Sequence, residues 1–350
     1  MKKLIKASAI ILLFVISTSI MSQSYNKNLS STVSANSNGP INVSVLISNF
    51  NLSVVSLIME ELKKTEQANP GVIQYTFYDG KGNQDIQNTQ LKTTLTNTNV
   101  DLIILDMVDA SYSKNAINRI KESNIPVIFL GNADIQSVMS YTKSYWMGPP
   151  PTDGGILQGS IIVDAWNNNK KGIDKNNDNI LQYIMIEGTP TNIYAVARTK
   201  LSIETANENN IATQELALKI CNWKQNEAKD AIASLFLKYG NKIEAIISND
   251  DTMAIGAIKG LQEYGYNLEN TPQKIMVIGF DGTVQAKELI EKGIMTGTVL
   301  QNLNKFANNI QTIILNLFNN KNLIEGTDCK IDSTGKIITA PYDGVLVNLN

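Results

Sequence analysis

The loop sequence at residues 174–182 is Asp174-Lys175-Asn176-Asn177-Asp178-Asn179-Ile180-Leu181-Gln182. Oxygen-bearing side chains stand at its first, third, fifth and ninth positions, and the seventh, Ile180, offers a backbone carbonyl. Because alternate residues of a tightly coiled loop point inward, this order surrounds a central point with oxygen atoms. The sixth position needs a sharp turn, and Asn179 tolerates left-handed backbone geometry better than most residues except glycine. The pattern is typical of a loop that holds a hard metal cation.

The spacing is the ligand order of an EF-hand-type calcium loop. From the loop alone, an ordinary surface turn remains an alternative, since Asn and Asp populate turns in any case. An EF-hand closes with a glutamate at the twelfth position, where this chain has Met185. The closing carboxylate must therefore come from elsewhere. Residues 182–186 read as a strand that leaves the loop, and not as the second helix of an EF-hand.

The 350-residue chain is long enough for two lobes with sizeable cores. Lys2, Lys3 and Lys6 precede an apolar run at residues 7–16, which predicts a secretory signal or an uncleaved N-terminal anchor. No cysteine follows this run, which excludes a lipoprotein anchor there. Residues 22–40 are rich in Ser, Asn, Thr and Gly, and we expect them to form a flexible linker. These features predict an exported protein, periplasmic or held at the cell surface.

Charge and residue counts exclude several classes of function. The formal net charge is −2, with 30 basic and 32 acidic residues and no basic run, which argues against a nucleic-acid partner. The chain has no histidine, so Ser-His-Asp nucleophiles and histidine-built zinc sites are excluded. Cys221 and Cys329 could pair, but two free thiols are the preferred interpretation. No P-loop or dinucleotide-type glycine fingerprint occurs, and hydrolysis by carboxylates alone remains open.

From residue 41 onward, apolar runs alternate with amphipathic segments, which predicts a βαβ series. Residues 149–151 are three prolines that interrupt the series, and a second series of similar size then begins. We therefore predict an α/β protein of two lobes with parallel sheets, and a ligand site beyond the carboxyl ends of the strands. The expected strands are 41–48, 72–78, 100–106, 125–130, 183–187, 211–218, 243–248, 274–280 and 295–300. The expected helices are 53–64, 85–95, 112–122, 153–168, 194–208, 227–237, 252–264, 284–292 and 306–318.

Several segments together resemble the periplasmic galactose/glucose-binding proteins, a calcium-containing group of type I periplasmic sugar-binding proteins. The likeness covers roughly residues 41–350 and is strongest from 153 to 301. Several matching segments in order, with the family's spacings, are more specific than any one of them alone. The segments that carry it are residues 174–182, 195–199, 242–257, 279–281 and 297–300.

The resemblance implies a type I periplasmic-binding-protein fold, with two Rossmann-like lobes, three crossovers and a central cleft. The implied crossings lie near residues 150, 300 and 338. Residues 1–40 would be a signal or anchor and a linker that precede both lobes. The implied lobes are 41–149 plus 301–337 for the N-terminal lobe, and 150–300 plus 338–350 for the C-terminal lobe.

Members of this family bind a monosaccharide in the cleft, close around it and deliver it to an ABC-type permease in the membrane. The resemblance implies an exported monosaccharide-binding protein, for a galactose-like or glucose-like sugar or a pentose. A sugar-sensing subunit that docks on a membrane sensor kinase is the main alternative. Two weaker alternatives are an enzyme with Asp250 and Asp281 as an acid/base pair, and a surface protein that has lost ligand binding.

The family completes its calcium site with a glutamate at the start of a later strand. Residues 242–251 match that segment and place Glu244 in this role. The resemblance thus implies one bound Ca²⁺ as a structural cofactor. Its implied ligands are Asp174, Asn176, Asp178, the Ile180 carbonyl, Gln182 and Glu244.

Four residues match sugar-binding positions of the family. Arg198 matches an arginine whose planar fork pairs with vicinal hydroxyls, and Trp223 matches a tryptophan that stacks on the apolar face of the sugar. Asp281, at the end of a strand, matches an acceptor carboxylate. Asp250 stands where the family has an asparagine. The alternatives without a ligand are an arginine on a helix surface, a core tryptophan and, for Asp281, a helix N-cap.

Other positions depart from the family. Asn192 and Tyr194 replace a histidine and an aspartate that both touch the sugar. Gln301 replaces an asparagine. The asparagine expected after residue 130 appears as Gly131, with Asn132 one residue later.

The family's acidic and aromatic pair after the first strand is represented by Asn49 and Phe50. One half of the pocket is thus kept and the other half is rebuilt. We expect Tyr194 to narrow the pocket, because a large phenol replaces a short acid. A site that pairs specific hydroxyls discriminates by roughly 10⁴ or more against mismatched ligands. The family's own ligand therefore cannot simply be transferred to this chain.

Overall fold

The computed structural model describes residues 39–348. The predicted signal or anchor and almost all of the predicted linker lie outside these residues. Within the described range, no helix combines the length and the apolar character needed to cross a membrane. Ile41–Asn350 form a compact unit of their own, and this unit contains two sheets with separate cores.

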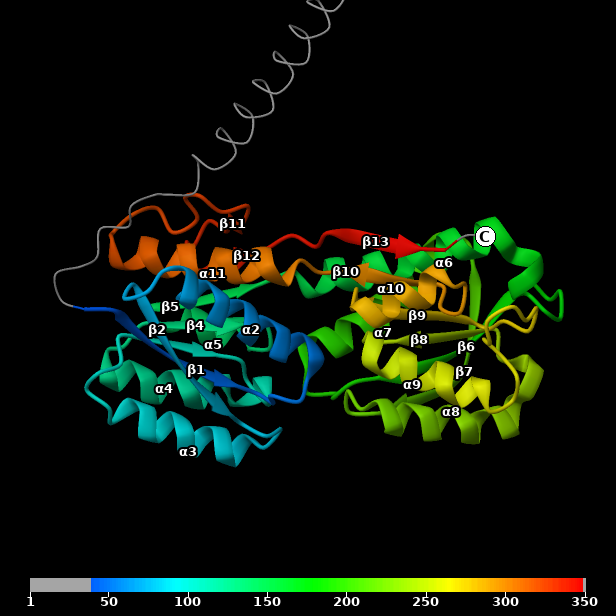
Figure 1. The fold of residues 1–350 in the computed structure, drawn as a ribbon, viewed down its shortest axis with the longest axis horizontal. Helices are drawn as coiled ribbons and strands as arrows, with labels where there is room; N and C mark the ends of the chain where they lie inside the picture. Colours follow the sequence, from blue (N-terminus) through cyan, green and yellow to red (C-terminus); the bar gives the residue numbers. More distant parts are fainter. Residues whose placement is uncertain (1–38, 349–350) are drawn as a thin grey trace, which may run out of the picture. The chain divides into compact units, whose positions relative to one another are not determined.

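The first lobe is built on a seven-stranded sheet in the order β11-β12-β5-β4-β3-β1-β2 (Figure 1). Neighbouring strands are parallel, except for the antiparallel pair β11 and β12. Helices α2 and α11 cover one face of this sheet, and α3, α4 and α5 cover the other. The strands are β1 (Ile41–Ile47), β2 (Ile73–Asp79), β3 (Leu102–Leu105), β4 (Val127–Leu130), β5 (Ser144–Gly148), β11 (Lys330–Ile331) and β12 (Ile337–Thr339). The helices are α2 (Ser53–Ala68), α3 (Gln84–Leu95), η1 (Ala110–Tyr112), α4 (Ser113–Ser123), α5 (Ile135–Met139) and α11 (Leu303–Phe318).

The second lobe is built on a six-stranded sheet in the order β13-β10-β9-β8-β6-β7. Only β13, against β10, runs antiparallel to its neighbour. Helices α6 and α7 pack on one face, and α8, α9 and α10 pack on the other. The strands are β6 (Ile180–Glu187), β7 (Ala212–Ile220), β8 (Ala245–Ser248), β9 (Met276–Asp281), β10 (Gly297–Leu300) and β13 (Gly344–Val347). The helices are α6 (Pro151–Ile173), α7 (Ile193–Glu208), α8 (Gln225–Tyr239), η2 (Gly240–Lys242), α9 (Asp251–Gln262) and α10 (Val284–Glu291).

The predicted α/β class, with two mostly parallel sheets covered by helices on both faces, is confirmed. The sequence analysis missed the short elements, namely β5, α5, β11, β12 and β13. These elements have two to five residues and lack the longer apolar run that marked four-residue strands such as β3 and β4. The two antiparallel pairs are formed by such short strands at the sheet edges, and they too were not expected. Cys221 and Cys329 are free and buried in different cores.

The chain passes three times between the sheets. It leaves β5 at Gly148 and begins α6 at Pro151. Proline suits this first helical position, because an N–H there would have no partner within the helix. It returns after Leu300, where β10 ends, and crosses again between Thr339 and Gly344. The boundary predicted at residues 337 and 338 falls inside β12, so that prediction was slightly early. The reason is that β12 pairs with β5 and extends the first sheet to Thr339.

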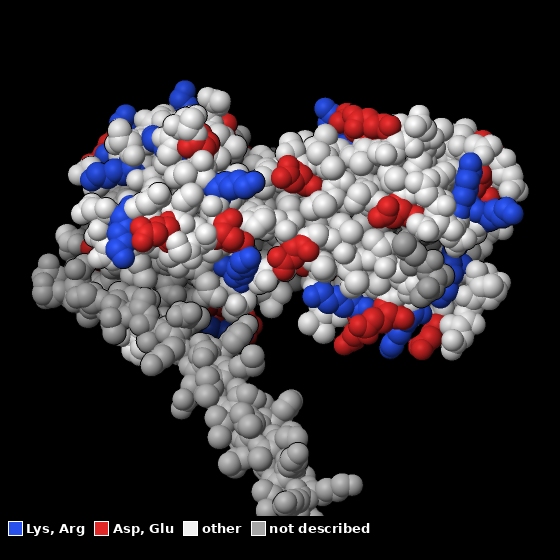
Figure 2. All heavy atoms as spheres, turned by 90° about the horizontal axis from the view of Figure 1, so that it is seen from above, with Lys and Arg blue, Asp and Glu red and all other residues white. Residues whose placement is uncertain are grey.

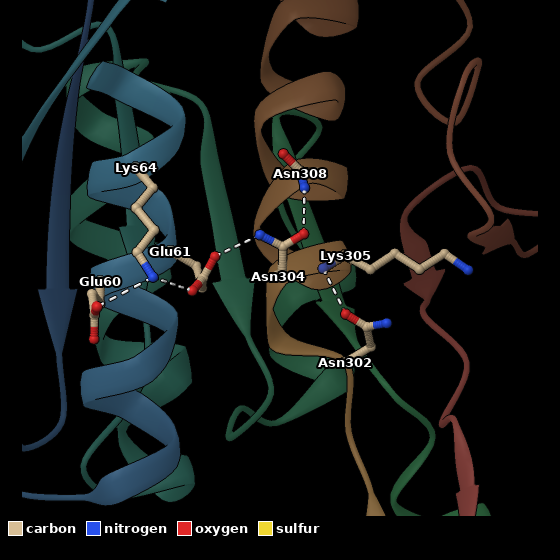
Figure 3. A network of polar contacts seen from close by, with 7 residues as sticks. All are labelled: Glu60, Glu61, Lys64, Asn302, Asn304, Lys305 and Asn308. Carbon is tan, nitrogen blue, oxygen red and sulfur yellow. Dashed lines mark hydrogen bonds and ion pairs between the residues drawn. The ribbon is translucent and has the colours of Figure 1, made fainter. Parts of the chain in front are cut away.

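The return of the chain to the first lobe is fixed by contacts between α2 and α11 (Figure 3). Asn302 caps α11 by accepting a hydrogen bond from the Lys305 backbone N–H at 3.0 Å. Two residues on, Asn304 donates to the Glu61 carboxylate of α2 at 2.6 Å, and the same carboxylate pairs with Lys64 at 2.7 Å. Asn304 and Lys64 are exposed and Glu61 is half-buried, so the apolar contacts beneath them contribute more to stability.

Charged side chains of both signs are interspersed on the face shown in Figure 2. No extended basic patch is visible on that face. This agrees with the balanced charge of the sequence, in which 30 basic residues accompany 32 acidic ones.

Candidate functional site

A pocket lies where the carboxyl ends of strands from the two sheets face each other. Its cavity volume is about 160 Å³, which is below the roughly 300–1,000 Å³ of sites for drug-sized ligands. Ser48 and Asp106 follow β1 and β3 of the first sheet, and Asp250 and Asp281 stand at the ends of β8 and β9 of the second. This is the position at which open α/β sheets bind ligands.

Most of the residues predicted to touch a ligand are brought together here. Asn49 and Phe50 are the two exceptions, because neither lines the pocket. The predicted residues that do line it are Asn132, Asn192, Tyr194, Arg198, Trp223, Asp250, Asp281 and Gln301.

Arg198 is buried on α7, with 7% of its surface exposed, so it is not an arginine of a helix surface. Its guanidinium carbon lies 3.4 Å from the centroid of the Phe280 ring, which holds the plane of the group by stacking. Its Nη1 donates to the Asn249 carbonyl at 2.7 Å. Its Nε is buried and has no hydrogen-bond partner among the described residues. Arg198, which lines the pocket, is therefore a fixed cation with one buried donor unpaired.

Asp281 ends β9 with a positive φ of 111°, which is unusual for a residue with a side chain. The N-cap of the next helix is Thr283, so Asp281 is not a helix cap. Its Oδ1 accepts from Gln301 Nε2 at 2.6 Å. Burial raises the pKa of Asp281 to about 6, although Arg198 and Gln301 act in the opposite direction. Such a strained, perturbed carboxylate in a pocket is typical of a functional site.

Asp250 caps α9, with Oδ1 accepting from the Met253 N–H at 2.7 Å. Burial, and next the negative charge of Asp281, raise the pKa of Asp250 well above its usual range. Behind it, Asp251 accepts from Thr298 Oγ1 and from the Thr283 N–H, each at 2.7 Å. Asp251 is fully buried and supports the pocket from below without lining it.

Trp223 lies at the edge of the second-lobe core and also lines the pocket. Trp223 has a φ of +63° and Asn222 before it has +49°, which is a strained turn for two residues with side chains. Gly188 lies under the indole ring, and a Cβ at that position would overlap the ring. The glycine therefore makes the space in which the indole lies.

Tyr194 reaches from α7 of the second lobe to the first lobe. Its hydroxyl donates to the Pro149 carbonyl at 2.9 Å. Its ring lies over two glycines: a Cβ at Gly131 would be 3.0 Å from the ring and one at Gly148 would be 2.5 Å from the hydroxyl. The phenol was expected only to narrow the pocket, but it also joins the two lobes.

The side chains of two predicted ligand residues already form hydrogen bonds with backbone groups. Asn132 donates to the Met107 carbonyl at 2.8 Å and accepts from the Ile193 N–H at 3.1 Å, so its amide links the lobes. Asn192 caps α7 by accepting from Tyr194 and Ala195 N–H groups. Both side chains position the pocket wall, and their oxygens are already engaged.

Asn49 and Phe50 were placed in the pocket by their position after the first strand, and that placement was wrong. The Asn49 side chain folds back to accept from the Asn51 N–H at 2.9 Å. Phe50 packs against the core of the first lobe. The next turn brings Leu52 and Ser53 to the pocket instead.

Asp106 is a pocket residue that the sequence analysis missed. It follows β3 and accepts from the Ser48 N–H at 3.1 Å. Burial raises its pKa to about 6. The available signal was its place at the carboxyl end of the most apolar strand of the first lobe.

The predicted calcium loop closes on itself and on Glu244. Asp174 accepts from the Asp178 and Asn179 N–H groups, each at 3.1 Å. Glu244, 1% exposed, accepts from the Lys175 and Gln182 N–H groups at 2.6 and 3.1 Å. Asn177 and Asn179 have φ values of 59° and 62°, as the expected tight coil requires.

The side-chain amides of this loop point to one carboxylate. Asn176 and Gln182 each donate to Asp178 Oδ2 at 2.8 Å. Turning each amide by 180° would present an oxygen where the nitrogen stands. Within residues 39–348, no group of three or more acidic, histidine or cysteine side chains is spaced to hold a metal ion by itself. A metal here would therefore need the amide and carbonyl oxygens as well.

The sequence matches the periplasmic binding protein domain over residues 43–322. A D-galactose/methyl-galactoside binding periplasmic protein of Haemophilus influenzae is 31% identical over 305 residues, which are 87% of this chain and 88% of that protein. The ribose import binding protein of Escherichia coli is 23% identical and covers 78% of this chain and 83% of its own.

The solved structures show the same fold. A solute binding protein of an ABC transporter from Bacillus halodurans, with bound myo-inositol, has a TM-score of 0.69 at 20% identity. The match covers 88% of this chain and 94% of that one. The relatives are named as binding proteins, so the sensor-kinase and enzyme alternatives gain no support from them.

Replacing Tyr194 by phenylalanine tests the contact between the lobes. The change leaves the Pro149 carbonyl without its hydroxyl donor, so we expect a loss of about 1 kcal/mol in the free energy of unfolding. Urea denaturation measures it. Tyr112→Phe is the matched control, because Tyr112 is 42% exposed and should change stability by less than about 0.5 kcal/mol. Equal effects of the two changes would contradict the assigned role.

The raised pKa of Asp281 predicts a pH dependence of stability. The pKa of an unfolded aspartate is about 3.9, and that of Asp281 is about 6. The folded state therefore binds the proton more tightly, and its stabilisation is complete below about pH 3.9 and lost as the pH rises through about 6. We expect Asp281→Asn to remove roughly 1–1.5 kcal/mol of the fall in stability between pH 5 and 7.5. Denaturation at both pH values, with exposed Asp343→Asn as the control, checks this; identical pH profiles would refute it.

Proposed function

Because this chain belongs to the periplasmic-binding-protein family, we propose that it binds a monosaccharide between its lobes and delivers it to an ABC-type permease in the membrane. The observation that carries the proposal is the convergence of Arg198, Trp223 and Asp281 with Asp106 of the other lobe on one pocket. The names of the relatives, two of which bind a galactoside or ribose, agree with it. Export is part of the proposal, since the first of them is a periplasmic protein.

Each group has a part in holding a sugar. The Trp223 indole offers an apolar face for the C–H groups of a pyranose or furanose ring. The free carboxylate oxygens accept hydrogen bonds from hydroxyl groups, and the unused Nε of Arg198 donates one. Because these groups come from both lobes, a ligand that bridges them favours the closed arrangement of the lobes.

The preferred sugar is proposed to be small, of pentose or hexose size. Tyr194 replaces a short acid of the galactose/glucose-binding proteins, and its ring fills the first-lobe side of the pocket against Gly131 and Gly148. The cavity volume of about 160 Å³ agrees with a single small ring. Tyr194 is therefore expected to weaken binding of galactose and glucose relative to a pentose.

A structural calcium ion in the loop at residues 174–182 is also proposed. Asp174, Asp178 and Glu244 supply three carboxylates, and Asn176, Gln182 and the Ile180 carbonyl supply neutral oxygens, which is a donor set suited to Ca²⁺. Neighbouring negative charges at Asp174 and Asp178 act with burial to raise the pKa of Glu244. A bound dication would remove this repulsion and hold the end of α6 to the start of β6 and β8.

Truncation of Arg198 tests the sugar pocket. We expect Arg198→Ala to weaken binding by about 2–5 kcal/mol, because Asp281 and the ligand hydroxyls lose their buried cationic partner. Calorimetry with arabinose, ribose, galactose and glucose measures the change, and Arg119→Ala, exposed on α4, is the control. Small-angle scattering at saturation should show a smaller radius of gyration. Undiminished binding by Arg198→Ala would sink the proposed pocket.

Metal removal tests the loop. A chelator should lower the melting temperature of the wild type, because three carboxylates are left to repel one another. Glu244→Ala should abolish this response, whereas Glu208→Ala, at an exposed position of α7, should keep it. A chelator effect of equal size in both variants would show that the metal, if any, binds elsewhere.

A further inference from the structure

The interior of the pocket carries an excess of negative charge. Asp106, Asp250 and Asp281 line it together with a single buried cation, Arg198. Lys305 also lines the pocket, but its ammonium is paired with Asp328 at 2.6 Å and both side chains are partly exposed. Three interior carboxylates therefore face one guanidinium.

Asp250 and Asp281 each have one oxygen engaged and one oxygen open, and Asp106 is bonded by Ser48. Asp106 Oδ2 accepts from the Ser48 N–H at 3.1 Å, and Asp250 Oδ1 accepts from the Met253 N–H at 2.7 Å. Asp281 uses Oδ1 for the Gln301 amide at 2.6 Å. Within residues 39–348, no hydrogen bond to the second oxygen of Asp250 or Asp281 is seen, whereas the Ser48 side chain also bonds to the Asp106 carboxylate. The pocket thus presents three carboxyl groups, two of which have an open oxygen.

Several hydrogen-bond donors of the pocket are already engaged. Arg198 Nη1 donates to the Asn249 carbonyl, and the amide nitrogen of Gln301 donates to Asp281. The Asn132 amide nitrogen is held by the Met107 carbonyl. A ligand with several donors therefore suits the open carboxyl oxygens, and it would gain from a positive charge.

Asp250 and Asp281 repel each other. The charge of Asp281 helps to raise the pKa of Asp250, after the larger effect of burial. Burying like charges in a small cavity is unfavourable unless a cation accompanies them. An ammonium ion carries three N–H donors and one positive charge, and so satisfies both the acceptors and the charge.

We propose that the ligand of this pocket is an amino sugar, whose protonated amine lies beside Asp250 and Asp281 while its hydroxyl groups face Asp106 and Arg198. This inference rests on the proposed sugar-binding function and specifies its ligand class. It makes Asp250 a specificity-determining residue. The galactose/glucose-binding proteins have a neutral asparagine at the matching position, which lacks the charge that would select an amine.

Calorimetry at pH 7 compares neutral sugars with their amines. The probes are galactose and galactosamine, glucose and glucosamine, and the two N-acetylated amines, which lack the charge. We expect at least one amine to bind roughly tenfold or more tightly than its neutral and N-acetylated counterparts. Neutral sugars that bind as tightly as every amine would overturn the inference and leave the proposed function standing. Absence of binding by every probe, and by the pentoses, would overturn both.

The variant Asp250→Asn tests the residue itself. It keeps the shape of the side chain and the acceptor for the Met253 N–H, so the fold is expected to persist, as a thermal unfolding curve would show. We expect the affinity for the amine to fall about tenfold or more and that for the neutral parent to stay or improve. Asp230→Asn, at an exposed position of α8 outside the pocket, is the control and should change both by less than about twofold. An equal loss for amine and neutral sugar in Asp250→Asn would refute the role of its charge.

Discussion

Parallel strands all reach their carboxyl ends at one edge of a sheet, and both sheets of this protein turn that edge toward the same pocket. The strands themselves are apolar and buried, so the first polar residue after each strand is where a functional side chain can stand. Asp106, Asp250 and Asp281 occupy such positions after β3, at the start of α9 after β8, and at the end of β9. The position of the site is therefore determined mainly by the arrangement of the two sheets, and less by any single loop.

The same edge also has to hold the lobes together, and this explains much of its chemistry. Asn132 and Tyr194 use their polar groups on backbone atoms across the pocket. Glycines at positions 131 and 148 make room for the phenol. The side chains of Asn132 and Tyr194 therefore set the distance between the two walls of the pocket. Arg198 and the carboxylates remain available to recognise a ligand.

Long strands, helices and loops with a regular residue spacing could be predicted from the sequence. Short strands and the hydrogen-bond partners of single side chains could not. The apolar run at β3 identified a buried parallel strand, and the spacing of the loop at residues 174–182 agrees with its coiled backbone. The five-residue strand β5 offered too few residues for a period. The identity of Asn132 shows what it can bond, but its partners, the Met107 carbonyl and the Ile193 N–H, are far away in sequence. Asn49 was misplaced for the same reason, because a turn of the backbone after β1 decides which side chain faces the pocket.

The first lobe is not a contiguous piece of chain. Its core takes Ile310, Ile313 and Ile314 from α11 and Ile338 from β12, after the whole of the second sheet except β13 has been passed. An N-terminal fragment of the chain on the ribosome therefore lacks one side of that core and cannot complete it. The core of the first lobe can be completed only when almost the whole of the chain has been synthesised.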